Sequence, residues 1–582
     1  MHLRWRMRLA AIVAVPALFL SASQRLKADD PAPPPPPASI GPNAESPPTA
    51  GGNLTISRDE LRNLIDEAIK EHDSKRPQAV PAIPVSRPAE DGTLLQNPGP
   101  KASDDLSKVV NDIISDREKA KAAADAKKKE QDRANGFVVG SADNLGATAR
   151  WRNYGLWIDS VDKSFQFHLG GRLQLDYVFN DFSDNISYAR GGLGPYPDGV
   201  NVRRARLTAE GTFYEQVNFD IEFDFVNSFD TRNGTTAKAA NYPITTDVNT
   251  PAPTDLWIEF AKLPIIGHIR VGNQKPGISM EHWESSRFLE FMERSLAFDA
   301  FIEEGNNGFS PGITTWNTVG QEELAWYNIG VFKTTRNIFG YNVGDNNWRL
   351  AGRGTWVPYW ADDGKYLVHV GVGGYYNSLD QGIARFRARP NERSGPSVFL
   401  PFLAVAQVNA DKEAVFAPEI AINLNRLCLQ AEYMGAYLYG VRNIIATPTQ
   451  SNVKLPPNRN YFAQGGYVEA LYFLTGEHRE YNKKTASFGR VVPLRNAYLV
   501  NGEDGGSIFS RGAWQVGVRY NYLDLNNNGI NGGQVNTVTY GLNWFLNPNA
   551  KVQWNYDVGY RDVSAPSSDR FSSFGMRFAM DF

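Results

Sequence analysis

The stretch FQFHLGGRLQLDYVF, residues 165–179, decides the fold because its apolar and polar side chains alternate along almost its whole length. The apolar set is Phe165, Phe167, Leu169, Leu173, Leu175, Tyr177 and Phe179. The polar set is Gln166, His168, Arg172, Gln174 and Asp176. Because successive side chains of a β-strand point to opposite faces, this period of two predicts a strand with one apolar and one polar side.

The same alternation returns in later segments of roughly ten residues, a length that crosses a bilayer when the strand is tilted. The segments are VNFDIEFDF (217–225), GAWQVGVRYNYLDL (512–525), KVQWNYDVGY (551–560) and FGMRFAMDF (574–582). Their polar faces carry carboxylates, guanidinium groups and amides, which are costly to bury without partners. These faces therefore need water while the opposite faces need an apolar environment.

Two folds satisfy this requirement: an outer-membrane β-barrel and a large secreted β-protein. The repeated strand length, the aromatic residues at strand ends and an export signal favour the barrel. Backbone groups in lipid must all be paired, so the strands have to close on themselves. Barrels of this kind resemble one another in ending on an aromatic residue that the barrel-assembly machinery recognises, and we expect Phe582 to be that signal.

The N-terminus has the order of a secretory signal peptide. Arg4, Arg6 and Arg8 precede an apolar stretch from Leu9 to Leu20, and small residues follow. An uncleaved anchor helix is the less favoured alternative, because a span needs about 20 apolar residues. We expect residues 1–28 to be cleaved and the mature chain to reach the cell outer membrane.

A periplasmic arm in four parts is expected between the signal peptide and the barrel. We assign residues 29–53 to a Pro-rich spacer, 54–76 to a short amphipathic helix, 77–102 to a Pro-rich linker and 103–135 to a helical segment. Helices this short are marginal alone, so their apolar stripes suggest packing between subunits, with a solvated arm as the alternative. The barrel then occupies residues 150–582.

The composition excludes several other classes of protein. A mean hydropathy of -0.40 argues against a helical membrane protein. A net charge of -3 shows no excess of basic residues of the kind that binds nucleic acid. The single cysteine, Cys428, excludes an intrachain disulfide. No catalytic or phosphate-cradling motif was found, so we expect no enzyme, no cofactor and no metal.

Several stretches resemble the phosphate-selective porins O and P. They are VRRARLTAEGTFYEQVNFDIEFDF (202–225), RVGNQKPGISMEHWESSRFLEFMERS (270–295), RFRARP (385–390), LTGEHREY (474–481) and GAWQVGVRYNYLDLN (512–526), followed by YGLNWFLNPNAKVQWNY (540–556). The resemblance covers about Tyr154 to Phe582. It implies a barrel of about 16 strands, a homotrimer, a third extracellular loop folded into the lumen, and basic residues that draw anions inward.

Two groups of arginines are candidates for the anion path. Arg204 and Arg206 should point into the lumen, because Ala205 and Leu207 take the lipid face, and Arg203 lies near the start of the strand. In the second group, Arg385, Arg387 and Arg389 form a ladder at period two, with Ala384, Phe386 and Ala388 expected to face lipid. The alternative is that these arginines pair with luminal carboxylates such as Glu210, Asp220, Glu222 and Asp224.

The resemblance assigns the constriction loop to the segment that begins near Lys275. Lys275, Arg287 and Arg294 are its candidate cations, although an ion-paired loop is an equal alternative. The chain then departs from the family with FDAFIEEGNNGF (298–309), which adds Asp299, Glu303 and Glu304 near the expected constriction. Selectivity follows the charge at the narrowest point, so these carboxylates put phosphate preference in doubt.

The sequence thus predicts an outer-membrane porin for passive diffusion of small anions, with phosphate or polyphosphate as the preferred solute. The alternative is a general or weakly selective porin whose N-terminal arm tethers the outer membrane to the cell wall or to a periplasmic partner.

Overall fold

The computed structural model describes residues 119, 123, 147–160, 163–188, 194, 196, 198–226, 251–303, 308–334, 348–379, 382–393, 402–445, 453–501, 507–563 and 567–582. The expected signal peptide and Pro-rich spacer, amphipathic helix and linker lie outside these residues, as does nearly all of the segment 103–135. Among the described residues, no helix is long and apolar enough to span a membrane.

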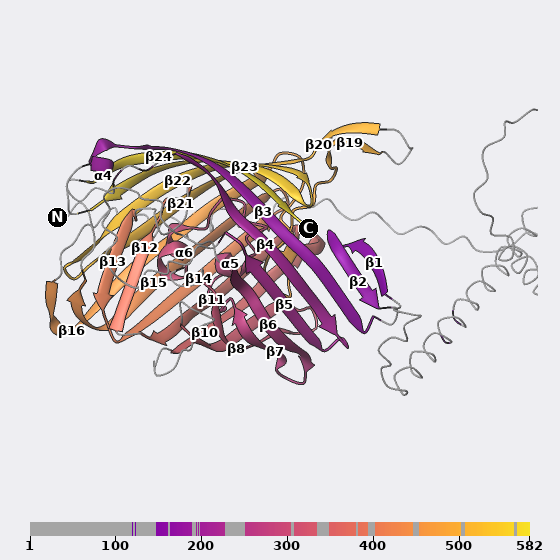
Figure 1. Cartoon of the computed structure of the whole chain (residues 1–582), viewed down its shortest axis with the longest axis horizontal. Helices are drawn as coiled ribbons and strands as arrows, with labels where there is room; N and C mark the ends of the chain where they lie inside the picture. Colours follow the sequence, from indigo (N-terminus) through magenta and orange to yellow (C-terminus); the bar gives the residue numbers. More distant parts are fainter. Residues whose placement is uncertain are drawn as a thin grey trace, which may run out of the picture. The chain divides into compact units, whose positions relative to one another are not determined.

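Sixteen antiparallel strands form a closed barrel, as the sequence predicts. Each strand pairs with the next along the chain, and the last strand, β24, pairs with the first, β3 (Figure 1). The barrel strands are β3 (Phe165–Phe182), β4 (Gly199–Phe213), β5 (Val217–Asp224), β6 (Ala252–Leu263), β7 (Gly267–Gln274), β8 (Ser310–Val319), β9 (Ala325–Lys333), β10 (Trp348–Ala361), β11 (Tyr366–Ser378), β14 (Lys412–Leu424), β15 (Leu427–Ile444), β16 (Val453–Phe473), β21 (Ala513–Asn527), β22 (Ile530–Asn547), β23 (Ala550–Asp562) and β24 (Asp569–Asp581).

The alternation of the sequence maps onto the two sides of the barrel wall. On β3, Leu169 and Phe179 are 46% and 55% exposed, whereas Gln174 and Asp176 are 2% and 1% exposed. Outward apolar side chains and inward polar ones fit a wall that faces lipid outside and water inside. Phe582 extends the closing pair, since its backbone N–H donates to Gly171 O and its carbonyl accepts from Gly171 N.

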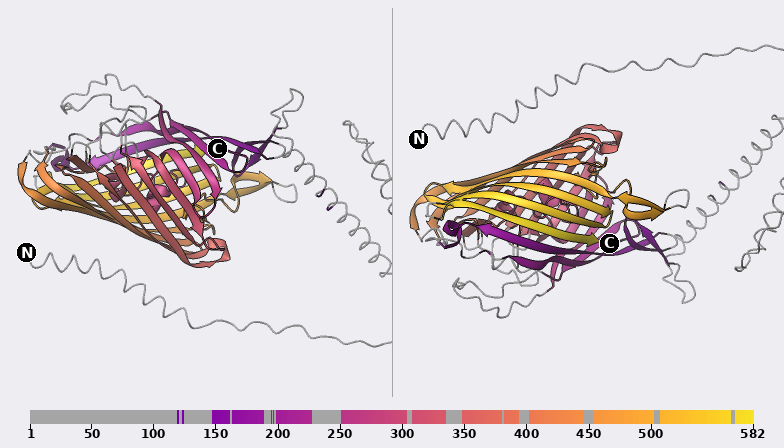
Figure 2. Two further views of the ribbon diagram at one scale, coloured as in Figure 1. Left: turned by 90° about the horizontal axis from the view of Figure 1, so that it is seen from below. Right: turned by 90° about the horizontal axis from the view of Figure 1, so that it is seen from above.

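Two strand pairs lie outside the barrel wall, at the end where the C-terminus is found (Figures 1 and 2). One is formed by β1 (Ala147–Arg152) and β2 (Gly155–Ser160), and β2 continues the sheet from β3. The other is the hairpin of β19 (Ala497–Asn501) and β20 (Ser507–Arg511).

Three connections enter the lumen and fill much of it. The first, between β7 and β8, contains α5 (Met280–Trp283) and α6 (Leu296–Phe301). The second, between β11 and β14, contains β12 (Ile383–Ala388) and β13 (Ala404–Asn409). The third, between β16 and β21, comes from the opposite end and contains β17 (Tyr481–Asn482) and β18 (Ser487–Phe488). Its Arg479 reaches Glu284 of the first connection at 2.8 Å.

The expectation that Ala384, Phe386 and Ala388 face lipid is wrong. They are 3%, 3% and 0% exposed and belong to an apolar cluster inside the barrel. Phe386 packs against Phe301 of α6 and Tyr461 of β16. The strand β12 therefore belongs to an inner hairpin, and its apolar face meets protein. Alternation alone cannot distinguish these two apolar environments.

Candidate functional site

The described part of the first connection, residues 275–303 and 308–309, contains two short helices that are capped. The Ser279 hydroxyl accepts a hydrogen bond from His282 N, and the Ser295 hydroxyl accepts one from Phe298 N. Ser295 itself donates through its backbone N–H and its hydroxyl to the carboxylate of Glu281, at 2.8 and 2.7 Å. Such caps satisfy N–H groups that a helix start leaves free, so this constriction segment presents its charged side chains in defined positions.

Arg203 points into the lumen because of a β-bulge. Between Gln174 and Leu175 of β3, the partner strand β4 steps from Arg204 to Val202, which leaves Arg203 as an extra residue. A bulge re-aims the inserted side chain. Arg203 thereby donates to both carboxylate oxygens of Glu293, at 2.7 and 2.9 Å.

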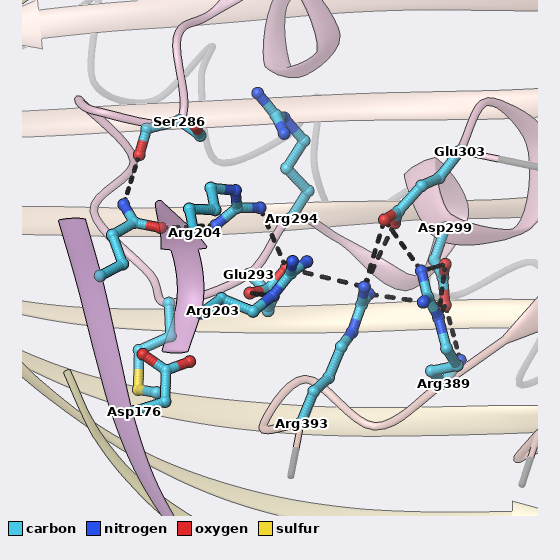
Figure 3. A network of polar contacts seen from close by, with 12 residues as sticks. Asp176, Arg203, Arg204, Ser286, Glu293, Arg294, Asp299, Glu303, Arg389 and Arg393 are labelled. Atoms are coloured by element: carbon cyan, nitrogen blue, oxygen red, sulfur yellow. Dashed lines mark hydrogen bonds and ion pairs between the residues drawn. The ribbon is translucent and has the colours of Figure 1, made fainter. Parts of the chain in front are cut away.

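Glu293 is the centre of an arginine cluster (Figure 3). Arg577 of β24 reaches it at 2.8 Å, and Arg204 and Arg393 lie 3.6 and 3.7 Å away. Burial disfavours the charged carboxylate, but these arginines and Arg203 outweigh burial and hold the pKa of Glu293 well below its usual range. The charged form of Glu293 therefore ties the constriction segment to the wall.

Two further carboxylates of the constriction segment, Asp299 and Glu303, contact the arginines of the inner hairpin. Arg389 lies 2.6 Å from Asp299 and 2.9 Å from Glu303. Arg387 lies 3.3 Å from Asp299, and Arg393 lies 3.3 Å from Glu303. Arg387 and Arg389 of the ladder therefore meet Asp299 and Glu303 in one network, although the sequence analysis assigned the two groups to separate features. Arg385 is half-buried on the same hairpin, and Glu304 lies outside the described residues.

A cavity of about 540 Å³ lies between the constriction segment and the wall. Ten basic residues line it: Arg172, Arg203, Arg204, Arg206, Arg270, Lys275, Arg287, Arg294, Arg389 and Arg393. Six acidic residues line it: Glu210, Asp220, Glu222, Asp224, Asp255 and Glu303. The described lining thus carries an excess of positive charge, which attracts anions in a narrow site with low-dielectric walls.

Most of these arginines form a salt bridge with a carboxylate. Arg206 contacts Glu222 and Asp224, both at 2.8 Å, and Arg172 also pairs with Glu222. Arg270 lies 2.7 Å from Glu259. These pairs favour the alternative reading of the arginines as partners of luminal carboxylates.

Lys275 and Arg294 differ from the other cations of the cavity. Among the described residues, neither forms a salt bridge to a carboxylate. Lys275 Nζ donates to the carbonyl of Glu284 at 3.1 Å. Arg294 donates to the carbonyls of Glu281 and Glu284, both at 2.6 Å. The carbonyls orient both side chains, and the nearest carboxylates act on them only through space, without a direct salt bridge. Arg287 is intermediate, with a hydroxyl partner, Thr208, at 3.2 Å and Glu222 at 3.7 Å.

Sequence reasoning placed Arg203, Arg204, Arg206 and Arg389 along the lumen and assigned Lys275, Arg287 and Arg294 to the constriction loop, and all of these residues line this cavity. It missed Arg172, Arg270 and Arg393 as lining residues. Arg172 stands on the polar face of the 165–179 stretch, so its inward direction was readable. The role of Arg393 could not be predicted from the sequence. Arg393 follows β12, and the alternation of apolar and polar residues does not reveal that β12 lies inside the barrel.

Comparison with known proteins identifies the family. The profile of "Phosphate-selective porin O and P" matches residues 167–582. Porin O of Pseudomonas aeruginosa is 24% identical over 431 residues, covering 69% of this chain and 84% of porin O. An uncharacterized protein of Caulobacter vibrioides is 25% identical over 434 residues, covering 73% of this chain and 75% of its own length.

Among solved structures, an anion-selective porin from Comamonas acidovorans aligns with a TM-score of 0.41 at 8% identity, over 72% of this chain and all of the other. That likeness is too remote to carry an argument. The family match and the closed barrel indicate an outer-membrane channel and not a catalyst. The chain belongs to the phosphate-selective porin O and P family.

Proposed function

We propose that this protein is a passive channel that admits small anions, with phosphate as the preferred solute. The observation that carries the proposal is the excess of basic over acidic residues in the cavity lining. Within that excess, Lys275 and Arg294 donate to backbone carbonyls and form no salt bridge to a described carboxylate. Ion selectivity follows the charge at the constriction, so a cationic lining admits anions and repels cations.

The paired arginines have a different role in this proposal. Arg389 and Arg393 offset Asp299 and Glu303, so these carboxylates repel anions less than their position alone suggests. The same pairs keep the constriction segment docked against the inner hairpin. Selectivity then rests on Lys275 and Arg294, with Arg287 beside them, more than on the ladder of Arg385, Arg387 and Arg389.

Diffusion down a gradient needs no cofactor and no energy source. An oxyanion entering the cavity exchanges water for guanidinium and ammonium N–H groups, which form charge-assisted hydrogen bonds. Because these donors belong to a capped segment, they need no rearrangement to receive the anion. A channel also has to release the anion again, so each contact in the cavity has to be weak enough to break.

Block of the chloride current by phosphate tests the proposal. The purified full-length protein is inserted in a planar bilayer, and the chloride current is measured while phosphate is added. Block by millimolar phosphate, absent with an uncharged solute of similar size, is the expected result. A chloride current that stays unchanged at these concentrations would mean that phosphate has no site in the channel.

The family resemblance also motivates three proposals about assembly. We propose that the barrel forms homotrimers, that Phe582 is recognised during barrel assembly, and that the N-terminal arm tethers the membrane to a cell-wall or periplasmic partner. Native mass measurement addresses the first, and the yield of folded protein from Phe582→Ala addresses the second. Deletion of residues 29–133, with conductance as the control, addresses the third.

A further inference from the structure

The cavity has an acidic side as well as a cationic one. Of its six carboxylates, Glu222, Asp224 and Glu303 pair with arginines, and Glu210 lies 2.8 Å from His168. Asp220 and Asp255 are different, because neither forms a salt bridge to a described residue. Two carboxylates, Asp220 and Asp255, and two cations, Lys275 and Arg294, thus form no direct salt bridge to a described residue, although Arg270 lies near enough to act electrostatically on both aspartates.

Both aspartates point into the cavity for reasons of strand geometry. On β5, Ile221 is 40% exposed on the outer face, so Asp220 lies on the inner face. On β6, the register with β5 shifts between Ile221 and Phe223, which leaves Thr254 and Asp255 as an irregularity. This shift places Asp255 on the same side as Thr254, where the indole Nε1–H of Trp257 donates to its Oδ1 at 3.1 Å.

The acidic and cationic sides face one space. Asp220 and Asp255 lie close enough to each other to interact electrostatically. Asp255 also interacts with Lys275, although the pair is too far apart for a direct salt bridge. A solute in the cavity can therefore contact cations on the constriction segment and carboxylates on β5 and β6 at the same time.

We propose that the cavity favours small oxyanions that also carry an ammonium group, such as amino-substituted phosphonates or phosphate monoesters. The proposal deepens the function above and rests on it. The oxyanion lies against Lys275 and Arg294, and the ammonium group lies against Asp220 and Asp255. Each end of the solute then supplies the charge that its side of the cavity lacks.

This arrangement predicts an effect opposite to that of a purely cationic channel. In a purely cationic channel, adding an ammonium group to an anion reduces its net negative charge and weakens its binding. In this cavity the added ammonium group contacts Asp220 and Asp255, two carboxylates that would otherwise repel the anion. Comparing two solutes that differ only in that group therefore separates the two kinds of channel.

The probes are 2-aminoethylphosphonate and ethylphosphonate, each tested as a blocker of the chloride current through the wild-type channel at pH 7. The proposal predicts a half-blocking concentration about fivefold lower for 2-aminoethylphosphonate, the size of effect expected for a solvent-screened ion pair. Equal or weaker block by 2-aminoethylphosphonate overturns the proposal. If phosphate still blocks in that case, the proposed function stands; if none of the three blocks, the proposed function falls.

Asp255→Asn tests the acidic side directly. This substitution preserves shape and should weaken block by 2-aminoethylphosphonate while strengthening block by ethylphosphonate, because it removes a repulsive charge. Asp362→Asn, in the turn after β10 and outside the cavity lining, is the matched control and should leave both values unchanged. A parallel change for both probes in Asp255→Asn would contradict the two-sided site.

Discussion

The basic residues of the cavity are of two kinds. Some form salt bridges that stabilise the fold, and others form no direct salt bridge and can bind a solute. Arg389 and Arg203 belong to the first kind, because each forms a short contact with a buried carboxylate. Lys275 and Arg294 belong to the second, because backbone carbonyls hold them. Arginine content alone therefore does not predict which residues set selectivity.

The double substitution Lys275→Gln with Arg294→Gln should remove most of the anion preference. It removes two basic groups that form no direct salt bridge to a described carboxylate, while glutamine can still donate to the carbonyls that hold the segment. We expect the anion-to-cation permeability ratio to fall several-fold towards unity and phosphate block to weaken by about tenfold, as for the loss of a charge-assisted contact. Permeability ratios from bilayer recordings provide the measurement.

Matched controls for that variant lie outside the cavity lining. Lys262 is largely exposed and pairs with Glu215 at 3.2 Å, and Arg426 is exposed in the turn after β14. Lys262→Gln with Arg426→Gln should keep the wild-type ratio. If both double variants behave alike, the selectivity has another origin.

Glu293→Gln should loosen the constriction segment, because it removes the carboxylate that four arginines share. Breaking a buried ion pair typically costs about 3–5 kcal/mol. A carboxyl group whose folded pKa is lowered contributes stability in full above its unfolded pKa of about 4.3, and loses it as the pH falls through the folded value. The stability difference between wild type and Glu293→Gln should thus stay constant from pH 8 to 5 and shrink only below about pH 4. Thermal unfolding in detergent at several pH values measures it; a difference that already shrinks between pH 7 and 5 would contradict the lowered pKa.

At the scale of elements, the constriction segment approaches the wall so closely that one strand residue has to be glycine. A Cβ atom on Gly373 of β11 would lie 2.0 Å from the carbonyl oxygen of Ile278. Gly373→Ala should therefore displace the segment, with an overpacking cost of roughly 1–3 kcal/mol. We expect higher open-channel noise and an altered single-channel conductance.

Gly354→Ala is the control for this prediction. Gly354 lies on the neighbouring strand β10, and a Cβ atom there has no neighbour within 4 Å. It should match the wild type in conductance and noise. Wild-type behaviour of Gly373→Ala would mean that the segment moves freely without affecting the pore.

The elements also show what the sequence could predict. Long alternating segments such as 165–179 were assigned correctly, because lipid outside and water inside impose the alternation. The inner hairpin was not predicted, because Phe386 alternates in the same way against Tyr461 as it would against lipid.

For the whole molecule, closure of the barrel and entry of three connections into its lumen create the cavity. The sequence indicated the barrel by periodicity, while the strand number and the inward loop came from the family resemblance. The direction of Asp255 could not be predicted, because it depends on an irregularity in the pairing of β5 with β6. The contact of Arg479 with Glu284 joins connections from opposite ends, which only the closed barrel brings together.

The central claim is that the excess positive charge of the cavity makes this channel prefer anions. The zero-current potential of the wild-type protein in a planar bilayer, measured under a KCl gradient, tests the claim most directly. We predict a potential whose sign shows chloride crossing more readily than potassium. A potential near zero, or one of the opposite sign, would mean that carboxylates such as Asp299 and Glu303 govern the pore and would contradict the account.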